Sequence, residues 1–145
     1  MSSFPAVEPV RFETKIAVLL RDDLLTWQRL NVTAFLVSGI AVGVPDVMGE
    51  PYVDGDGTTY LPMFRQPLLV FEADRATISA ARSRALARGL AISVFTADLF
   101  GTGHDAANRA AVAAVSGDRL DVVGLGLHGP RTAVDKALKG STLHR

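Results

Sequence analysis

Polar residues at the ends of predicted strands are the first candidates for chemistry in this sequence. Asp23 follows the apolar run from Lys15 to Leu20, and Asn31 lies a turn beyond the junction between that strand and a predicted helix. Ligands of α/β proteins bind where strands end and helices begin, so a carboxylate and an amide here are candidate ligand-binding groups. Helix capping by Asp23 and a hydrogen bond from Asn31 to nearby backbone are the alternatives without a ligand.

A second cluster follows the predicted strand from Ala91 to Thr96. Asp98 and Thr102 lie there with His104 close by, so a carboxylate, a hydroxyl and an imidazole are expected at one edge of the sheet. Such groups serve in acid–base and nucleophilic catalysis. Capping of the next helix by Thr102 or Asp105 explains part of the pattern without a reaction.

The segment from Gly43 to Gln66 is too long for an ordinary connection and is rich in Gly, Pro and Asp. We expect an ordered functional loop or a short hairpin here. Asp54-Gly-Asp56-Gly is similar to a calcium loop, but the positions where an EF-hand needs its glycine and closing carboxylate hold other residues. Asp-Gly pairs also form hairpin turns. Glu50, Asp54 and Asp56 are candidates for the mouth of a pocket.

The predicted strand from Asp121 to Leu127 carries Gly124 and Gly126 on one face, and His128 follows in phase at its end. A strand without side chains on one face lets a helix or a ligand approach closely, and helix packing is the simpler interpretation. His128 is a candidate ligand-binding residue. So is Arg131 at the start of the last helix, where backbone amides and a guanidinium can hold an anion.

Composition excludes several classes of function. Fifteen basic residues balance fifteen acidic ones, so we expect neither nucleic acid nor a membrane as a partner. The absence of cysteine excludes thiol catalysis and Cys-ligated zinc, and it suits the cytoplasm. No dinucleotide fingerprint, phosphate loop or histidine-rich cluster is present, so the sequence indicates no cofactor and no metal.

Four short apolar runs alternate with four helix-like segments, which predicts a layered α/β sheet. The strands are expected at Lys15 to Leu20, Pro67 to Glu72, Ala91 to Thr96 and Asp121 to Leu127. Their continuous apolar character indicates that helices cover both faces of the sheet. We expect residues 1–12 to form a flexible tail and residues 13–145 to form one domain.

Two of the predicted helices have different patterns. The helix from Leu25 to Ala41 is expected to bury an apolar track at i+3 and i+4 spacing, formed by Trp27, Leu30, Ala34, Val37 and Ala41. Its mixed track through Asn31 and Phe35 is expected to face something polar. In the helix from Ala76 to Arg88, the expected buried stripe is Ile78, Ala81 and Ala85, and solvated arginines flank it.

Five motifs occur in order along the chain: Lys15-Ile-Ala-Val, Leu30-Asn31-Val-Thr-Ala34, Met48-Gly49-Glu50, Asp54-Gly-Asp56-Gly and Gly124-Leu-Gly126-Leu-His128-Gly129-Pro130-Arg131. This combination resembles the family called domain of unknown function 2000, from about Lys15 to the C-terminus. That family looks similar to peptidyl-tRNA hydrolase type II. The resemblance implies a single-domain, three-layer α/β/α sandwich around a mixed four-stranded sheet, and a homodimer.

The resemblance also bears on catalysis. Arg21-Asp22-Asp23-Leu24 is similar to a turn near the start of the hydrolases, and Asp98 and Thr102 are similar to their Asp and Thr after the third strand, which implies catalytic roles. The proposed catalytic lysine of the hydrolases has no counterpart here. The charge that would orient a water or stabilise an oxyanion is therefore missing, and Arg29 is a poor proton shuttle.

Three functions follow from these observations. The expected one is a small polar ligand-binding protein or unassigned enzyme, with a pocket beside Asp23, Asn31, the loop from Glu50 to Asp56, and His128. The alternatives are a peptidyl-tRNA hydrolase-like ester hydrolase that uses Asp98 and Thr102, and a non-catalytic dimeric interaction module. A shared fold cannot choose among them.

Overall fold

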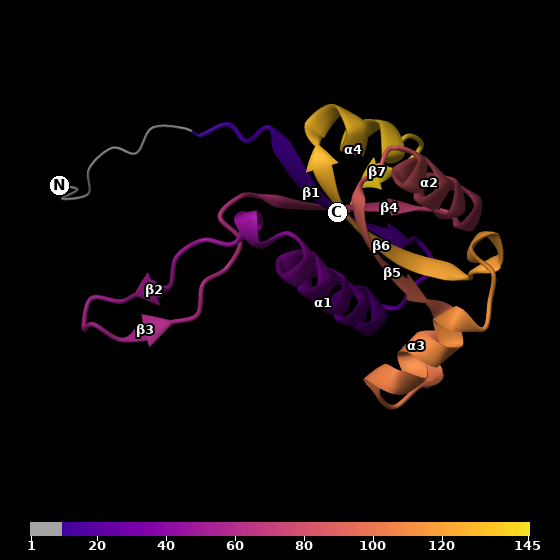
Figure 1. The fold of residues 1–145 in the computed structure, drawn as a ribbon, viewed down its shortest axis with the longest axis horizontal. Helices are drawn as coiled ribbons and strands as arrows, with labels where there is room; N and C mark the ends of the chain where they lie inside the picture. Colours follow the sequence, from indigo (N-terminus) through magenta and orange to yellow (C-terminus); the bar gives the residue numbers. More distant parts are fainter. Residues whose placement is uncertain (1–9) are drawn as a thin grey trace.

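The computed structural model describes residues 10–145, and the centre of this part of the chain is a five-stranded sheet. Its strands are β1 (Thr14–Arg21), β4 (Leu68–Ala73), β5 (Ala91–Thr96), β6 (Val122–Pro130) and β7 (Thr142–Leu143). They lie in the order β5-β6-β1-β4-β7 (Figure 1). β1 and β4 are parallel, and the other neighbouring pairs are antiparallel.

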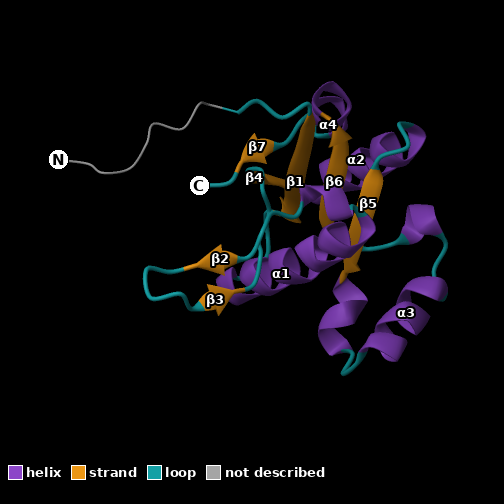
Figure 2. Ribbon diagram, turned by 60° about the vertical axis from the view of Figure 1, so that its left-hand side comes forward, coloured by secondary structure: helices purple, strands orange, loops and turns teal. Residues whose placement is uncertain are grey.

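Helices cover both faces of this sheet (Figure 2). α1 (Thr26–Gly43) packs on one face, whereas α2 (Arg75–Ala87) and α4 (Arg131–Ala137) pack on the other. α3 (Asp105–Ala113) follows the 3₁₀ turn η2 (Ala97–Gly101) and lies beyond the edge strand β5. The remaining 3₁₀ turns are η1 (Pro45–Val47) and η3 (Gly117–Arg119). Within residues 10–145, no helix has both the length and the apolar character needed to cross a membrane.

The prediction of one mixed α/β domain is confirmed, but the predicted number of strands is wrong. β7 adds a fifth strand by pairing with Phe71 and Glu72 of β4. A strand of two residues is too short to form an apolar run that a sequence pattern can reveal. The layers also differ from a simple sandwich, because α3 and a separate hairpin lie outside them. Of the predicted tail, residues 1–9 are outside the described part, and residues 10–12 have no regular structure.

α1 lies close to β6 because this strand has glycine where the helix crosses it. A Cβ atom at Gly124 would lie 2.5 Å from a methyl group of Val32, and one at Gly126 would collide with the Ser93 hydroxyl. That hydroxyl donates a 2.9 Å hydrogen bond to the Leu36 carbonyl in the middle of α1. The two glycines therefore serve helix packing, the simpler of the two interpretations of this strand.

The predicted buried track of α1 is wrong. The buried residues are Val32, Leu36 and Ile40, whereas Trp27 and Leu30 are 58% and 70% exposed. No charged residue occurs between Leu30 and Val44, so the apolar periodicity is nearly the same on both sides of the helix and does not identify the buried one. In α2, the predicted stripe of Ile78, Ala81 and Ala85 is buried as expected.

The long segment from Gly43 to Gln66 forms a hairpin, which is one of the two structures predicted for it. β2 (Tyr52–Val53) pairs with β3 (Thr59–Tyr60) in antiparallel fashion. At the base, the Gly49 amide donates to the Met63 carbonyl at 2.8 Å, and the Arg65 amide donates to the Val47 carbonyl at 2.8 Å. The hairpin extends away from the sheet beyond the C-terminal end of α1 (Figure 1).

Candidate ligand-binding cleft

Two adjoining hollows lie between α1, β5, η2 and α3, and we call them together the α1–α3 cleft. Their volumes are about 520 and 400 Å³. Residues of all four elements line both hollows: Phe35, Phe95, Leu99, Asp105 and Asn108. The size suits a small molecule, and the mixture of apolar walls with a few polar groups is typical of ligand pockets.

Aromatic rings form one side of the cleft. Trp27 and Phe100 meet edge to face with centroids 5.8 Å apart, and Phe35 and Phe95 do the same at 5.9 Å. Phe95 and Phe100 join the two pairs at 5.1 Å. Phe95 is 4% exposed, whereas Trp27 and Phe35 are more than half exposed at the opening. Rings fixed in this way provide flat apolar surfaces with little loss of side-chain freedom on binding.

Polar side chains enter the cleft from α1 and α3. His104 is the N-cap of α3, because its Nδ1 accepts a hydrogen bond from the Ala107 amide at 3.3 Å. The proton of the neutral ring is therefore on Nε2, which is free to donate to a ligand. The Thr102 hydroxyl contacts the Asn108 amide oxygen and lies 3.0 Å from the Leu99 carbonyl, so the Asn108 amide nitrogen stays available. Asn31 lines the same hollow.

The charges at the cleft neutralise each other. Asp105 forms an ion pair with Arg109, which lies one turn further along α3, and both side chains are largely exposed. A surface pair of this kind adds little stability but leaves no net charge at the opening. The cleft therefore favours an uncharged ligand over an anion or a cation.

A second groove of about 570 Å³ lies on the other side of α1, against β4 and β7. Its polar groups are already bonded within the protein. Arg29 donates to the Leu24 carbonyl at 2.9 Å, to the Asp22 carbonyl at 2.6 Å and to Glu72 at 2.8 Å. Thr33 donates to the Arg29 carbonyl. Because these donors are used, this groove has less capacity to recognise a polar ligand than the α1–α3 cleft.

Of the residues predicted as site residues, the structure brings Asn31 and Thr102 together in the cleft. Asp98 is exposed on η2 and does not line it. Asp23 forms an ion pair with Arg21 at 2.7 Å, and this contact lowers the pKa of the Asp23 carboxyl. Arg21 also binds Asp121 at 2.5 Å, so Asp23 belongs to an ion-pair cluster at the end of β1.

Asp54 has a structural role in the hairpin turn. Its carboxylate accepts hydrogen bonds from the amides of Asp56 and Thr58, at 2.9 and 3.1 Å, and from the Tyr60 hydroxyl at 2.8 Å. The Tyr60 hydrogen bond is the main reason why the pKa of Asp54 is lowered. Glu50 and Asp56 are exposed on the same hairpin, away from the cleft of their own chain.

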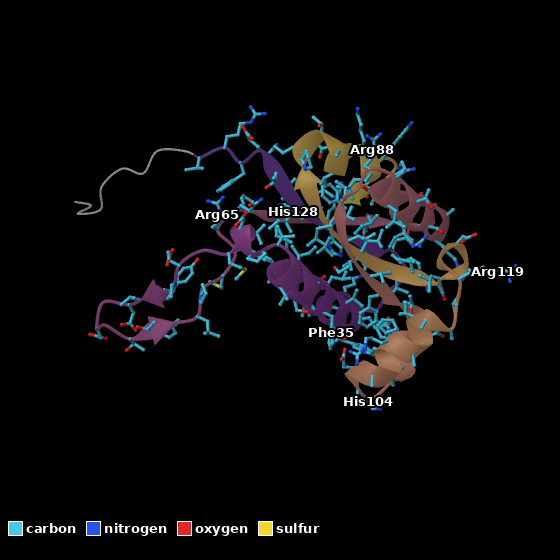
Figure 3. The ribbon with its side chains drawn as sticks, viewed as in Figure 1. Phe35, Arg65, Arg88, His104, Arg119 and His128 are labelled. Carbon is cyan, nitrogen blue, oxygen red and sulfur yellow. The ribbon has the colours of Figure 1, made fainter. Side chains whose placement is uncertain are left out.

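His128 and Arg131 lie elsewhere. His128 pairs with Ile16 and Ala91 near the opposite end of the sheet, and partial burial lowers its pKa. Figure 3 shows it well separated from Phe35 and His104. Arg131 lines a separate hollow of about 280 Å³ and donates to the Phe12 carbonyl at 3.4 Å. The expected single pocket with Asp23, Asn31, the hairpin and His128 is therefore not formed within one chain.

Sequence analysis missed Trp27, Phe35 and Asn108 as parts of a site. A usable signal was present in α1, where Trp27, Asn31 and Phe35 follow one another at i+4 spacing and so share one face. The mixed track through Asn31 and Phe35 was expected to face something polar, and it faces the cleft. Within residues 10–145, no cluster of three or more His, Asp or Glu side chains is arranged to hold a metal ion.

One comparison with known proteins identifies the family of this chain, and another finds a similar solved structure. Residues 14–145 match the model of the family described as protein of unknown function (DUF2000), so the chain belongs to this family. A solved structure, that of the protein of unknown function Atu0240 from Agrobacterium tumefaciens strain C58, is similar to it at 47% identity and a TM-score of 0.90. The similarity covers 93% of this chain and all of that one. No curated protein matches the chain.

Proposed function

We propose that the protein binds a small, uncharged molecule with a flat apolar body and a hydrogen-bonding edge in the α1–α3 cleft. One observation carries this proposal. Aromatic walls from α1 and β5 lie beside Asn31, His104 and Asn108, which have hydrogen-bonding groups still available. A flat ring stacks on aromatic faces, and amide and imidazole groups bind the polar atoms at its edge. A neutral heteroaromatic compound combines both properties.

The other functions suggested by the sequence have less support. A hydrolase would need a free nucleophile or a positioned base, but Thr102 is occupied by the Leu99 carbonyl and Asn108, and Asp98 is exposed outside the cleft. Arg29 is engaged on the opposite side of α1. A relation of the fold to type II peptidyl-tRNA hydrolases and a cytoplasmic location stay predictions.

Thermal unfolding in the presence of indole, adenine and nicotinamide tests the proposal. A compound that binds only the folded protein raises the melting temperature with concentration, as mass action requires. We expect at least one of the three neutral heteroaromatic probes to do so. Asn31→Ala removes one hydrogen-bonding group and should weaken that binding by about 1 kcal/mol, roughly fivefold in Kd.

Ser83→Ala is the matched control, because Ser83 is an exposed polar residue of α2 that does not line the cleft. It should leave the temperature shift unchanged. The proposal fails if none of the three probes raises the melting temperature at millimolar concentration. It also fails if Asn31→Ala and Ser83→Ala affect the shift equally.

A further inference from the structure

The outer face of α1, which we define by Trp27, Leu30, Ala34, Ser38 and Val42, is exposed and carries no charge. The exposed fractions of Trp27, Leu30 and Val42 are 58%, 70% and 83%. A helix that is apolar on every side is normally covered on every side, because apolar surface in contact with water is unfavourable. The sheet covers only one side of α1. Something else is therefore expected to cover the other.

The hairpin presents a second uncovered apolar surface. Tyr52, Val53, Tyr60, Leu61 and Met63 are each at least 49% exposed, and Leu61 is 85% exposed. Within residues 10–145, neither β2 nor β3 packs substantially on any element except the other. An isolated two-stranded hairpin is marginally stable in water. A hairpin with this many exposed apolar side chains is expected to rest on another surface.

We propose that both surfaces are covered by a second copy of this chain, with the α1 helices of the two copies packed antiparallel across a two-fold axis near Ala34. Two-fold symmetry places the same patch on both sides of the interface, so each copy covers the exposed apolar surface of the other. Ala34 and Ser38 are small and allow the helix axes to approach to about 8 Å. In this arrangement Asn31 of one copy lies opposite Ser38 of the second, and Trp27 lies opposite Val42.

The antiparallel arrangement decides where the hairpins go. The hairpin extends beyond the C-terminal end of α1, whereas α3 and the cleft lie beside its N-terminal half (Figure 1). The C-terminal end of one α1 meets the N-terminal end of the other. The hairpin of the second copy is therefore directed to the opening of the α1–α3 cleft, next to Trp27 and Asn31. There the exposed apolar side chains of the hairpin cover the opening, so the site is completed by the partner.

The exposed apolar area is sufficient for such a dimer. The eight large side chains that are exposed on the outer face of α1 and on the hairpin offer on the order of 100 Å² each, or about 800 Å² per copy. A stable interface of ordinary size buries about 800 Å² per partner. The absence of charge across the outer face of α1 also means that pairing two copies brings no like charges together. The dimer does not depend on the proposed ligand, but completion of the cleft by the hairpin rests on the proposed function.

Light scattering coupled to size exclusion measures the mass of the full chain. We expect twice the monomer mass of 15.4 kDa for the wild-type protein at micromolar concentration. Ala34→Arg places a charge at the two-fold axis and should reduce the mass to that of the monomer. Ser83→Arg makes the same kind of change at an exposed small residue of α2 and should leave the dimer intact. A monomeric wild-type chain, or a dimeric Ala34→Arg variant, overturns the proposal.

Disulfide trapping tests the direction of the helices, and the chain contains no cysteine that would interfere. Asn31→Cys and Ser38→Cys should form a disulfide when the two variants are mixed and oxidised. Neither variant alone should do so, because equal positions of the two copies lie about 10 Å apart along the helices. Disulfides within either single variant would indicate a parallel pair and overturn the proposal. Circular dichroism of each variant checks that it is folded.

The outcomes separate this inference from the proposed function. A monomer that still binds a heteroaromatic probe overturns the dimer and leaves the cleft as the binding site. A dimer that binds no probe supports the inference and contradicts the proposed function. For a dimer that binds a probe, Leu61→Ser should weaken both dimerisation and probe binding, because Leu61 lies on the hairpin and is absent from the cleft of its own chain. Unchanged probe binding in a weakened dimer overturns completion of the cleft by the hairpin.

Discussion

α1 and α2 cover opposite faces of the same sheet, but their outer surfaces have opposite character. α2 buries Ile78, Ala81 and Ala85 and carries arginines beside this stripe, so water is its natural outer environment. α1 buries Val32, Leu36 and Ile40 and presents an uncharged apolar surface to the outside. α2 therefore has one apolar surface, which faces the core, whereas α1 has a second apolar surface that faces outward.

The difference shows what an apolar pattern can establish. In α2, charge marks the outer side, and the position of the buried stripe follows from the sequence. In α1, the sequence has no charge after Arg29 within the helix, so the pattern indicates a helix without indicating its orientation. An ambiguous orientation thus reflects apolar residues on more than one side of the helix.

Truncation of buried residues is the strongest test of this comparison. Leu36→Ala in α1 and Ile78→Ala in α2 each remove a side chain that is 1% exposed. Each should lower the free energy of unfolding by about 2–5 kcal/mol, because burial is lost and a cavity remains. Urea denaturation measures the change. Similar losses on both faces would confirm that both helices belong equally to the core.

Leu30→Ala is the control within α1, since Leu30 is 70% exposed. In protein diluted until it is monomeric, this substitution should change the free energy of unfolding by no more than about 0.5 kcal/mol. A loss as large as that of Leu36→Ala would mean that Leu30 is buried and that α1 faces the sheet with a different side.

A smaller effect is expected where α1 crosses β6. Gly124→Ala places a methyl group against Val32 and Leu36, which should cost about 1–3 kcal/mol of unfolding free energy through overpacking. On the face toward α2, the neighbouring positions of the same strand hold Leu125 and Leu127, so side chains fill the space there instead of a close approach of the helix. In a Leu36→Ala background the cost should fall, because the cavity receives the methyl group.

Gly55→Ala is the matched control, because no atom lies within 4 Å of a Cβ atom built at this hairpin position. It should change the free energy of unfolding by no more than about 0.5 kcal/mol. Equal effects of Gly124→Ala and Gly55→Ala would show that α1 does not rest directly on β6.

The smallest expected effect concerns the first turns of the two helices. Asp74 caps α2 by accepting from the Thr77 amide at 2.8 Å, and the hydrogen bonds with Thr77 lower the pKa of its carboxyl. The folded-state pKa lies below the unfolded value, so this stabilisation is present above the unfolded pKa and is lost as the pH falls through the folded pKa. At the start of α1, the neutral side chain of Gln28 accepts from the Leu25 amide at 2.9 Å.

Denaturation at pH 7 and at pH 3 should therefore distinguish the two helix starts. Asp74→Asn keeps a capping group and removes the titration, so the variant should lose less stability on acidification than the wild-type protein. Gln28→Ala should cause a small loss of the same size at both pH values. If Asp74→Asn and the wild-type protein respond identically to acid, the carboxylate of Asp74 does not stabilise the start of α2.

Much of the fold was predictable, for a physical reason. Continuous apolar runs identified β1, β4, β5 and β6, because strands covered on both faces need them. The pairing of β4 with β7 was not predictable, since the two residues Thr142 and Leu143 form no pattern. Their position depends on hydrogen bonds to a strand far away in the sequence, such as that from the His144 amide to the Val70 carbonyl at 2.8 Å.

The candidate site was predictable only in part. Asn31 and Thr102 were identified because each follows a junction between a strand and a helix. His128 was placed in the same pocket because it also ends a strand, but β6 runs antiparallel to β1 and so ends at the opposite edge of the sheet. Strand direction is a property of the tertiary structure. The positions at which strands end in the sequence do not reveal the direction of each strand in the sheet.

The hydroxyl of Ser93 has a consequence for everything that rests on α1. It binds the carbonyl of Leu36 at 2.9 Å, halfway along the helix, from the edge strand β5. A slip of α1 by one turn would displace it by about 5.4 Å and break this bond. The axial position of the helix is thus fixed at its midpoint. Any molecule seated at either end of α1 is held at a constant distance from β5.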